Sequence, residues 1–156
     1  MVLSTLHTND APSTITRLLN MGIESFLVTA SLNLVVAQRL GRRVCTNCAA
    51  PDPDITKEQL MDMGLPADRA DVRKVMKGKG CSKCGNTGHK GRVGIYEVLA
   101  ITDVIKEAIL NGVSSTELKQ IAIEEAGFKT MRASALNQLL NGITSVSEVL
   151  RVSAAD

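Results

Sequence analysis

The sequence predicts an α/β protein whose middle part is folded around a metal ion. Short apolar segments suited to strands alternate with segments in which apolar residues recur at helical spacing. Hydrophobic residues make up 44% of the chain and charged residues 22%, which is typical of a globular protein. The only four cysteines form two C-x-x-C pairs, Cys45 with Cys48 and Cys81 with Cys84. These three observations set the fold class, and the elements follow in chain order.

The N-terminal part is predicted to contain two strands and two helices. Apolar, β-branched residues favour strands, whereas Asn, Asp and Ser favour the residue that caps a helix and Gly the residue that ends it. In order, we expect a strand over 2–6, a helix capped by Asn9 or Asp10 and ended by Gly22, a helix capped by Ser25, and a strand over 35–40.

The two cysteine pairs are spaced as in a structural zinc site. Each pair brings two thiolates within reach of one ion, and together they complete the tetrahedron that Zn²⁺ prefers. We therefore expect Cys45, Cys48, Cys81 and Cys84 to hold Zn²⁺, with no open position for catalysis. Structural disulfides, a redox-active pair and an iron–sulfur cluster are the alternatives. The sequence shows no signal-peptide pattern that favours disulfides, and redox chemistry needs only one pair.

The segment between the cysteine pairs must leave the metal and return to it. Thr56 and Gln59 form a capping box for a short helix that ends at Gly64. Pro66 is expected to open a second helix that runs toward Met76. Residues 92–99 are then expected to form a strand that returns to the body of the protein.

Glycines and capping residues divide the tail into four short helices. We expect these helices to form one small bundle over 101–152, with their apolar stripes as its core and no chemistry implied. In order, they are the helix from Asp103 to Gly112, the helix capped by Ser114 and Glu117 that ends at Gly127, the helix from Thr130 to Gly142, and the helix capped by Ser145 and Glu148.

Composition excludes several classes of function. A net charge of +2 and only three aromatic residues argue against nucleic-acid binding. No apolar run approaches the roughly 20 residues of a membrane span, so we expect no direct membrane insertion. Phosphate-loop, nucleophile-elbow and H-E-x-x-H motifs do not occur in these residues. Metal-bound, reduced cysteines indicate a cytoplasmic protein. Basic residues gather near the cysteines, either as a solvated face or as a contact for an acidic partner: Arg42, Arg43, Lys74, Lys77, Lys79, Lys83, Lys90 and Arg92.

Several motifs occur in an order that resembles one known family. They are Ser4-Thr-Leu-His7-Thr-Asn9-Asp-Ala, Arg17-Leu-Leu-Asn-Met-Gly22, Gln38-Arg-Leu40, the two cysteine pairs, Gly91-Arg-Val-Gly-Ile-Tyr-Glu-Val-Leu99 and Asn141-Gly-Ile-Thr-Ser-Val-Ser-Glu-Val-Leu-Arg151. Together they are similar to the C-terminal part of the type II secretion and type IV pilus assembly ATPases, the GspE/PilB-type hexameric motors. The resemblance covers essentially the whole chain and favours the pilus-assembly branch.

The resemblance implies a more specific fold. It implies the C-terminal portion of a RecA-like P-loop ATPase domain with a tetracysteine zinc-binding insertion and a C-terminal helical bundle. The implied ranges are a partial RecA-like domain over 1–44, a tetracysteine zinc-binding subdomain over 45–91, a strand returning to the core over 92–100, and a C-terminal helical subdomain over 101–156.

The resemblance also implies roles for individual residues. The segment around His7 resembles the histidine box of the family, which follows a strand and faces the γ-phosphate of ATP. A histidine at the carboxyl end of a parallel strand lies where open α/β sheets bind ligands, so we expect His7 to act as the catalytic-site sensor of that phosphate. Arg17, Gln38 and Arg39 match elements near the nucleotide. The alternatives are a solvated helix arginine at Arg17 and a surface strand end at Gln38 and Arg39.

The sequence departs from the family pattern in what it leaves out. The phosphate loop and the acidic strand that bind Mg²⁺ and ATP are not among these residues, so we expect a C-terminal fragment, natural or engineered, that is inactive alone. The expected partners in the parent homohexamer are its own N-terminal ATPase half, the neighbouring subunits and the inner-membrane platform protein. These partners would hold it at the cytoplasmic face of the bacterial inner membrane. A free-standing zinc-ribbon-like adaptor that binds protein or nucleic acid is the alternative function.

Overall fold

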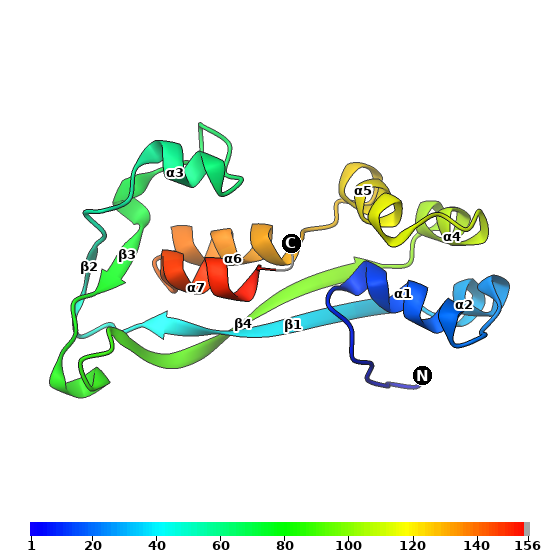
Figure 1. Cartoon of the computed structure of the whole chain (residues 1–156), viewed down its shortest axis with the longest axis horizontal. Helices are drawn as coiled ribbons and strands as arrows, with labels where there is room; N and C mark the ends of the chain where they lie inside the picture. The colour runs from blue at the N-terminus through cyan, green and yellow to red at the C-terminus, as the bar shows by residue number, and fades with distance from the viewer. Residues whose placement is uncertain (155–156) are drawn as a thin grey trace. The chain divides into compact units, whose positions relative to one another are not determined.

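A computed structural model describes residues 1–154, which form short helices and antiparallel strands (Figure 1). The predicted mixed α/β character is confirmed. The chain divides into two compact units: unit 1 is Met1–Ala37 with Tyr96–Thr130, and unit 2 is Gln38–Ile95 with Met131–Asp156. The RecA-like assignment stays a prediction.

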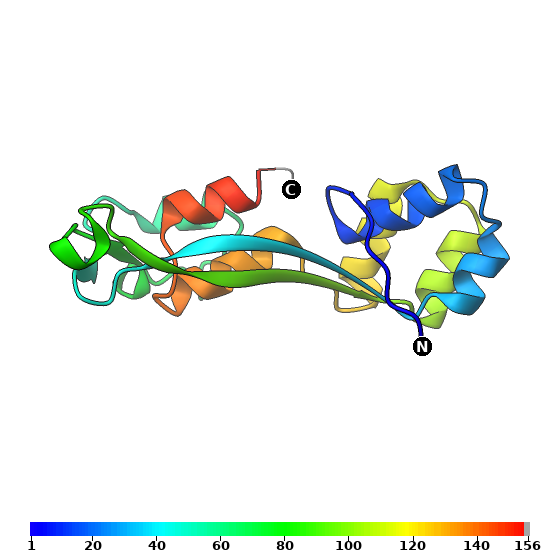
Figure 2. The ribbon, with the colours of Figure 1, turned by 90° about the horizontal axis from the view of Figure 1, so that it is seen from below.

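Two long strands, β1 (Leu34–Val44) and β4 (His89–Ala100), form a two-stranded sheet. Figures 1 and 2 show them side by side and running in opposite directions. They confirm the strands predicted over 35–40 and 92–99. Along the end of β4, Ile95 and Leu99 are buried whereas Tyr96 and Val98 are about half exposed. This alternation is the two-residue period of a strand with one covered face.

Unit 1 packs four helices around a core built mainly of aliphatic residues. The helices are α1 (Ala11–Asn20), α2 (Ser25–Ser31), α4 (Asp103–Leu110) and α5 (Ser115–Glu125). Two predicted caps are confirmed: Asp10 accepts a hydrogen bond from the Ser13 N–H at 2.9 Å, and Ser114 accepts one from the Glu117 N–H at 3.2 Å. Ser25 and Asp103 are the first helical residues, and Glu24 and Thr102 precede them as the capping residues.

The core of unit 1 lies among these helices and the ends of the two long strands. Burying one such aliphatic side chain contributes roughly 1.5–3 kcal/mol, so packing accounts for the buried apolar residues of these helices. The core residues are Ala11, Ile15, Val28, Val35, Leu99, Ile101, Ile105, Ala108, Ile109, Leu118, Ala122 and Phe128.

The strand predicted over residues 2–6 is not formed. These residues have no regular secondary structure, and the side chains of Val2 and Leu3 are 91% and 86% exposed. A strand gains its backbone hydrogen bonds only from a neighbouring strand. None of the strands within residues 1–154 pairs with this segment. The composition of this segment therefore favours a strand, but the described chain provides no neighbouring strand to pair with it.

Unit 2 contains the excursion between the cysteine pairs. Strand β2 (Ala49–Pro51) pairs antiparallel with β3 (Met76–Gly78), with Ala49 opposite Gly78. Helix α3 (Lys57–Asp62) has the predicted capping box of Thr56 and Gln59. The prediction of a helix from Pro66 toward Met76 is wrong. A single turn follows Pro66, and the Asp71 carboxylate then accepts from the Arg73 N–H and starts a short 3-10 turn, η1 (Val72–Lys74).

The tail helices belong to two units and do not form the single bundle expected over 101–152. Helix α4 packs on α2 and α5 on α1, whereas α6 (Met131–Leu140) packs on α7 (Val146–Val152) within unit 2. The reason is that the buried residues of α5 join the core of unit 1 before the chain continues into α6. The predicted functional ranges stay predictions, and residues 155 and 156 of the range 101–156 lie outside the described residues.

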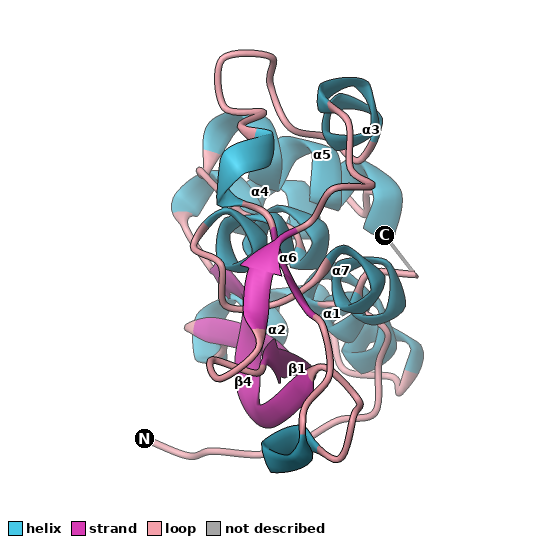
Figure 3. Cartoon of the chain, turned by 90° about the vertical axis from the view of Figure 1, so that its left-hand side faces the viewer, coloured by secondary structure: helices cyan, strands magenta, loops and turns pink. Residues whose placement is uncertain are grey.

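Figure 3 distinguishes the helices, strands and loops of the described chain by colour. None of the described helices has the length and apolar composition needed to cross a membrane.

Candidate functional site

The four cysteines lie together in unit 2. Cys45 follows β1 and Cys48 precedes β2. Cys81 precedes the short turn η2 (Ser82–Cys84), and Cys84 is the last residue of that turn. Their Sγ atoms all lie within 4.8 Å of one another. The predicted grouping of these residues is confirmed.

The spacing of the sulfur atoms fits a tetrahedral metal site. The Sγ–Sγ distances are 3.9 Å from Cys45 to Cys81, 3.9 Å from Cys48 to Cys84, and 3.7 Å from Cys81 to Cys84. A disulfide requires about 2.05 Å, and all four cysteines are free. Four sulfurs placed about 2.3 Å from a central ion at tetrahedral angles are about 3.8 Å apart. The donor set and its spacing therefore suit a thiolate-bound cation.

Tight backbone turns aim the sulfurs at one point. The Cys48 N–H donates to Cys45 O at 3.1 Å, and the Cys84 N–H donates to Cys81 O at 3.1 Å, so each pair folds back on itself. The Cys45 N–H also donates to Gly88 O at 2.9 Å, which joins the first pair to the chain after the second. The backbone at Gly88 also approaches Gly78 closely. Position 78 requires glycine, because a Cβ there would lie 2.0 Å from Gly88 O.

The environment of the thiols differs from one cysteine to another. The side-chain amide of Asn47 donates to the Cys81 Sγ at 3.3 Å and lowers the pKa of that thiol to about 6, which favours the thiolate that binds metals. Burial raises the pKa of Cys48 to about 12. A cation bound here would displace the Cys48 proton, so metal uptake would release protons.

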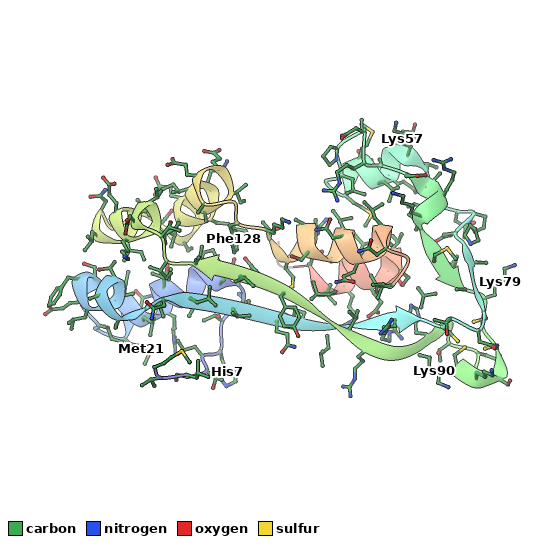
Figure 4. All side chains as sticks on the ribbon, turned by 180° about the vertical axis from the view of Figure 1, so that it is seen from behind. His7, Met21, Lys57, Lys79, Lys90 and Phe128 are labelled. Atoms are coloured by element: carbon green, nitrogen blue, oxygen red, sulfur yellow. The ribbon has the colours of Figure 1, made fainter. Side chains whose placement is uncertain are left out.

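His7 and Arg17 lie together in unit 1. They line an open pocket of about 260 Å³ between the segment that precedes α1, α1 itself and the start of α5. Figure 4 shows the labelled His7 in the segment that leads into α1. The remaining lining residues are all hydroxyl or amide side chains: Thr8, Asn9, Ser13, Thr16, Asn20 and Ser115.

Helix α5 contributes to this pocket in a way that the sequence did not indicate. Ser115 lines it, and Lys119, one turn later, pairs with the Asp10 carboxylate at 3.6 Å. Asp10 is the capping residue of α1, so this pair holds α5 against the start of α1. The distance in sequence between Asp10 and Lys119 left no local pattern from which this contact could be read.

Gln38 and Arg39 are both exposed on β1, in unit 2. The Arg39 Nη1 donates to the Gln38 carbonyl at 3.2 Å. Neither residue lines the pocket that His7 and Arg17 share. The nucleotide-binding roles of all four residues stay predictions.

Glu148 forms a buried charge cluster that the sequence analysis missed. Its side chain is fully buried and accepts from the Arg42 N–H at 2.7 Å, from the Arg42 guanidinium, and from the Arg151 guanidinium at 2.7 Å. Burial alone would raise the pKa of this carboxyl, but the hydrogen bonds from Arg151 and Arg42 lower it to about 2. The predicted capping box of Ser145 and Glu148 is therefore wrong, because Arg42 and Arg151 hold the Glu148 carboxylate. The spacing of Glu148 and Arg151, three residues apart on α7, was the available signal.

Sequence comparison identifies the group of proteins to which these features belong. Residues 1–151 match the sequence model of the family described as "Type II/IV secretion system protein". The chain belongs to this family. The type IV pilus assembly ATPase PilB of Myxococcus xanthus is 49% identical over 156 residues, which are 100% of this chain and 27% of that protein. PilB of Thermus thermophilus is 46% identical over 96% of this chain and 17% of its own length.

The secretion branch of the family is also represented. Type II secretion system protein E of Aeromonas hydrophila is 39% identical over 100% of this chain and 30% of its own length. The resemblance predicted from the motifs is thereby confirmed. The chain spans less than a third of the length of each of these three relatives.

Proposed function

We propose that this chain is part of an ATPase that powers type IV pilus assembly or type II protein secretion. The observation that carries this proposal is the family match over residues 1–151, together with relatives that are named pilus assembly ATPases. The greater identity to PilB of Myxococcus xanthus, 49% against 39% to the secretion protein of Aeromonas hydrophila, favours the pilus branch. The match also favours a motor component over a free-standing zinc-ribbon adaptor.

The pocket of His7 and Arg17 is the proposed nucleotide-facing site. An imidazole and a guanidinium provide hydrogen bonds and positive charge suited to phosphate oxygens, and the surrounding hydroxyl and amide groups add further donors. We assign His7 to contact with the γ-phosphate and Arg17 to support of the same charge. Gln38 and Arg39 are assigned to the nucleotide from β1. ATP and Mg²⁺ are the proposed cofactors of the intact protein.

The cysteine cluster is the proposed site of a structural Zn²⁺. Cys45, Cys48, Cys81 and Cys84 would hold the ion, which supplies a crosslink between the two ends of the excursion. With four protein ligands no coordination position is left for a substrate. The metal would therefore stabilise unit 2 and take no part in hydrolysis.

Partners are proposed from the machines in which the relatives work. The parent would be a homohexamer at the inner face of the bacterial inner membrane, in contact with its own N-terminal half, with neighbouring subunits and with the platform protein. Between residues 72 and 95 the sequence has seven basic residues and no acidic residue, which suits an acidic protein surface.

The proposed role of His7 is tested in the longer protein that contains this chain. We expect His7→Ala to lower kcat for ATP hydrolysis on the order of 100-fold, as for loss of one donor to a developing charge, with nucleotide affinity little changed. Lys57→Ala, on the exposed side of α3 in unit 2, is the control and should be neutral. Unchanged kcat in His7→Ala, or steady ATP turnover by the purified 156-residue chain alone, would contradict the proposal.

A further inference from the structure

The segment from Gly142 to Arg151, which contains most of α7, makes direct hydrogen bonds to the chain on both sides of the cysteine cluster. We propose that this segment, called the tail brace, is part of the support of the metal centre, and that Ser145 and Glu148 are positioning residues for the four cysteines. The inference rests on the proposed metal site. It extends that site beyond the range 45–91 to residues far along the chain.

The tail brace binds the strand that leads into the first cysteine pair. The Val44 N–H, next to Cys45, donates to Ile143 O at 2.9 Å. The Thr144 hydroxyl donates to Arg42 O at 2.8 Å, and the Arg42 N–H donates to the Glu148 carboxylate at 2.7 Å. One step further back, the Arg151 guanidinium donates to Leu40 O at 2.9 Å. The bonded residues of β1 are alternate ones, so the brace satisfies the edge of β1 as a neighbouring strand would.

The tail brace also binds the chain that follows the second cysteine pair. The Ser145 Oγ lies 2.9 Å from His89 Nε2, and His89 Nδ1 lies 3.1 Å from Thr87 O. Since a carbonyl oxygen only accepts, Nδ1 donates to Thr87 O, and Nε2 is left to share a hydrogen bond with the Ser145 hydroxyl. The Thr87 hydroxyl in turn donates to Cys84 O at 2.7 Å. A chain of hydrogen bonds thus joins the brace to a metal-ligating residue.

Burial protects the brace side of these connections, whereas the bonds at Thr87 and Leu40 are exposed. Thr144 and Glu148 are 0% exposed and Ser145 is 5% exposed, so water has little access to these three side chains. Loss of one partner leaves a buried polar group unsatisfied, which strongly favours the intact arrangement. The brace touches no sulfur atom in the contacts above. It acts by fixing the backbone on both sides of the cluster, and outer partners of metal ligands commonly change metal affinity roughly 10–100-fold.

The test measures how fast the purified chain loses Zn²⁺ to an excess of a coloured chelator. We expect Ser145→Ala, which removes a single hydroxyl group, and Glu148→Gln each to speed zinc release at least about tenfold. Leu150→Ala is the matched control on the same helix, because this side chain is 47% exposed and makes none of these bonds. Its release rate should equal that of the wild type.

A second control separates the brace from general stability. Val152→Ala removes buried apolar volume from α7 and should lower the melting temperature. At temperatures well below that melting temperature, it should not speed zinc release. If Val152→Ala speeds release as much as Ser145→Ala does, or if Ser145→Ala and Glu148→Gln release zinc at the wild-type rate, the inference is overturned. A wild-type chain without stoichiometric metal would instead overturn the metal site itself.

Discussion

At the scale of single residues, the chemistry of unit 2 is set by a few side chains that share charges or protons. Glu148 is buried between two arginines, and Cys81 is held near the other thiols with an amide hydrogen bond from Asn47. Each arrangement favours an ionised side chain where burial alone would oppose it. Substitution of either residue should therefore have a measurable effect on metal binding or on stability.

The thiolate set should be indispensable as a whole. We expect Cys81→Ser to abolish stoichiometric metal binding, because a serine hydroxyl at this position is a poor replacement for a thiolate in a tetrahedral zinc site. Elemental analysis of the purified chain gives the metal content. Ser82→Ala, at the exposed neighbouring position, should keep one ion per chain. A Cys81→Ser chain that keeps both its metal and its fold would rule out the tetrathiolate site.

The Glu148 carboxylate should make stability depend on pH in acid. Its pKa falls from the ordinary value of 4.5 to about 2 in the folded chain. A carboxyl group with a lowered pKa stabilises the fold at pH values above its ordinary pKa. This stabilisation is lost as the pH falls through the pKa of the folded chain. We expect Glu148→Gln to lower the free energy of unfolding at about pH 6 by on the order of 2 kcal/mol. The difference in unfolding free energy between the variant and the wild type should become smaller toward about pH 2. Denaturant titrations at several pH values measure it, and a gap independent of pH would contradict the assignment.

At the scale of elements, the pairing of β2 with β3 determines the shape of the excursion. The pair begins just after Cys48 and ends just before Cys81, and the Lys79 N–H donates to Cys48 O at 3.0 Å. The excursion therefore closes at its base before the second cysteine pair begins. Gly78 lies at this base, in close contact with Gly88.

A side chain at Gly78 should open the base of the excursion. The Cβ of alanine would overlap the backbone at Gly88, which cannot rotate away as a side chain could. We expect Gly78→Ala to destabilise unit 2 by about 1–3 kcal/mol, the usual effect of overpacking, and to weaken metal retention. Lys79→Ala, at the exposed next position, is the control. Equal unfolding midpoints for the two variants in denaturant would show that the close contact is not needed.

The elements also show what the sequence could and could not predict. Capping boxes at Thr56 and Ser114 were readable because both partners lie within four residues. The cysteine cluster was readable because metal ligation imposes fixed spacing. The segment 2–6 was misread because a strand depends on a partner outside it. Ser145 is the capping residue of α7, as predicted, but its hydroxyl bonds to His89, which is distant in sequence, and makes no bond to the α7 backbone.

At the scale of the whole molecule, the two units depend on different sources of stability. The core of unit 1 is a continuous apolar cluster drawn only from residues of that unit. Unit 2 contains the cysteine cluster, the tail brace and several short elements of three residues. Short elements bury little area, so a bound metal would contribute a large share of the stability of unit 2.

Removal of the metal should therefore affect the units unequally. We expect a chelator to raise amide hydrogen exchange throughout residues 38–95, since structural zinc contributes on the order of 10 kcal/mol in small modules. Protection of the helical amides at Ile109 and Leu118 in unit 1 should persist. Exchange followed by mass spectrometry resolves the two regions, and simultaneous loss of protection in both would show that the units unfold together.

The paired base of the excursion also bears on how the family can diversify. Since β2 and β3 fix where the loop leaves and returns, an insertion at an exposed turn between Asp52 and Val75 need not move the sulfur atoms. Lengthening a closed loop costs little entropy, with about 0.6 kcal/mol for each doubling. Insertions and deletions among relatives should accordingly collect in this stretch. Members of the family could thus change the part of the excursion far from the cysteines to suit a different binding partner, while the positions of the four sulfur atoms stay the same.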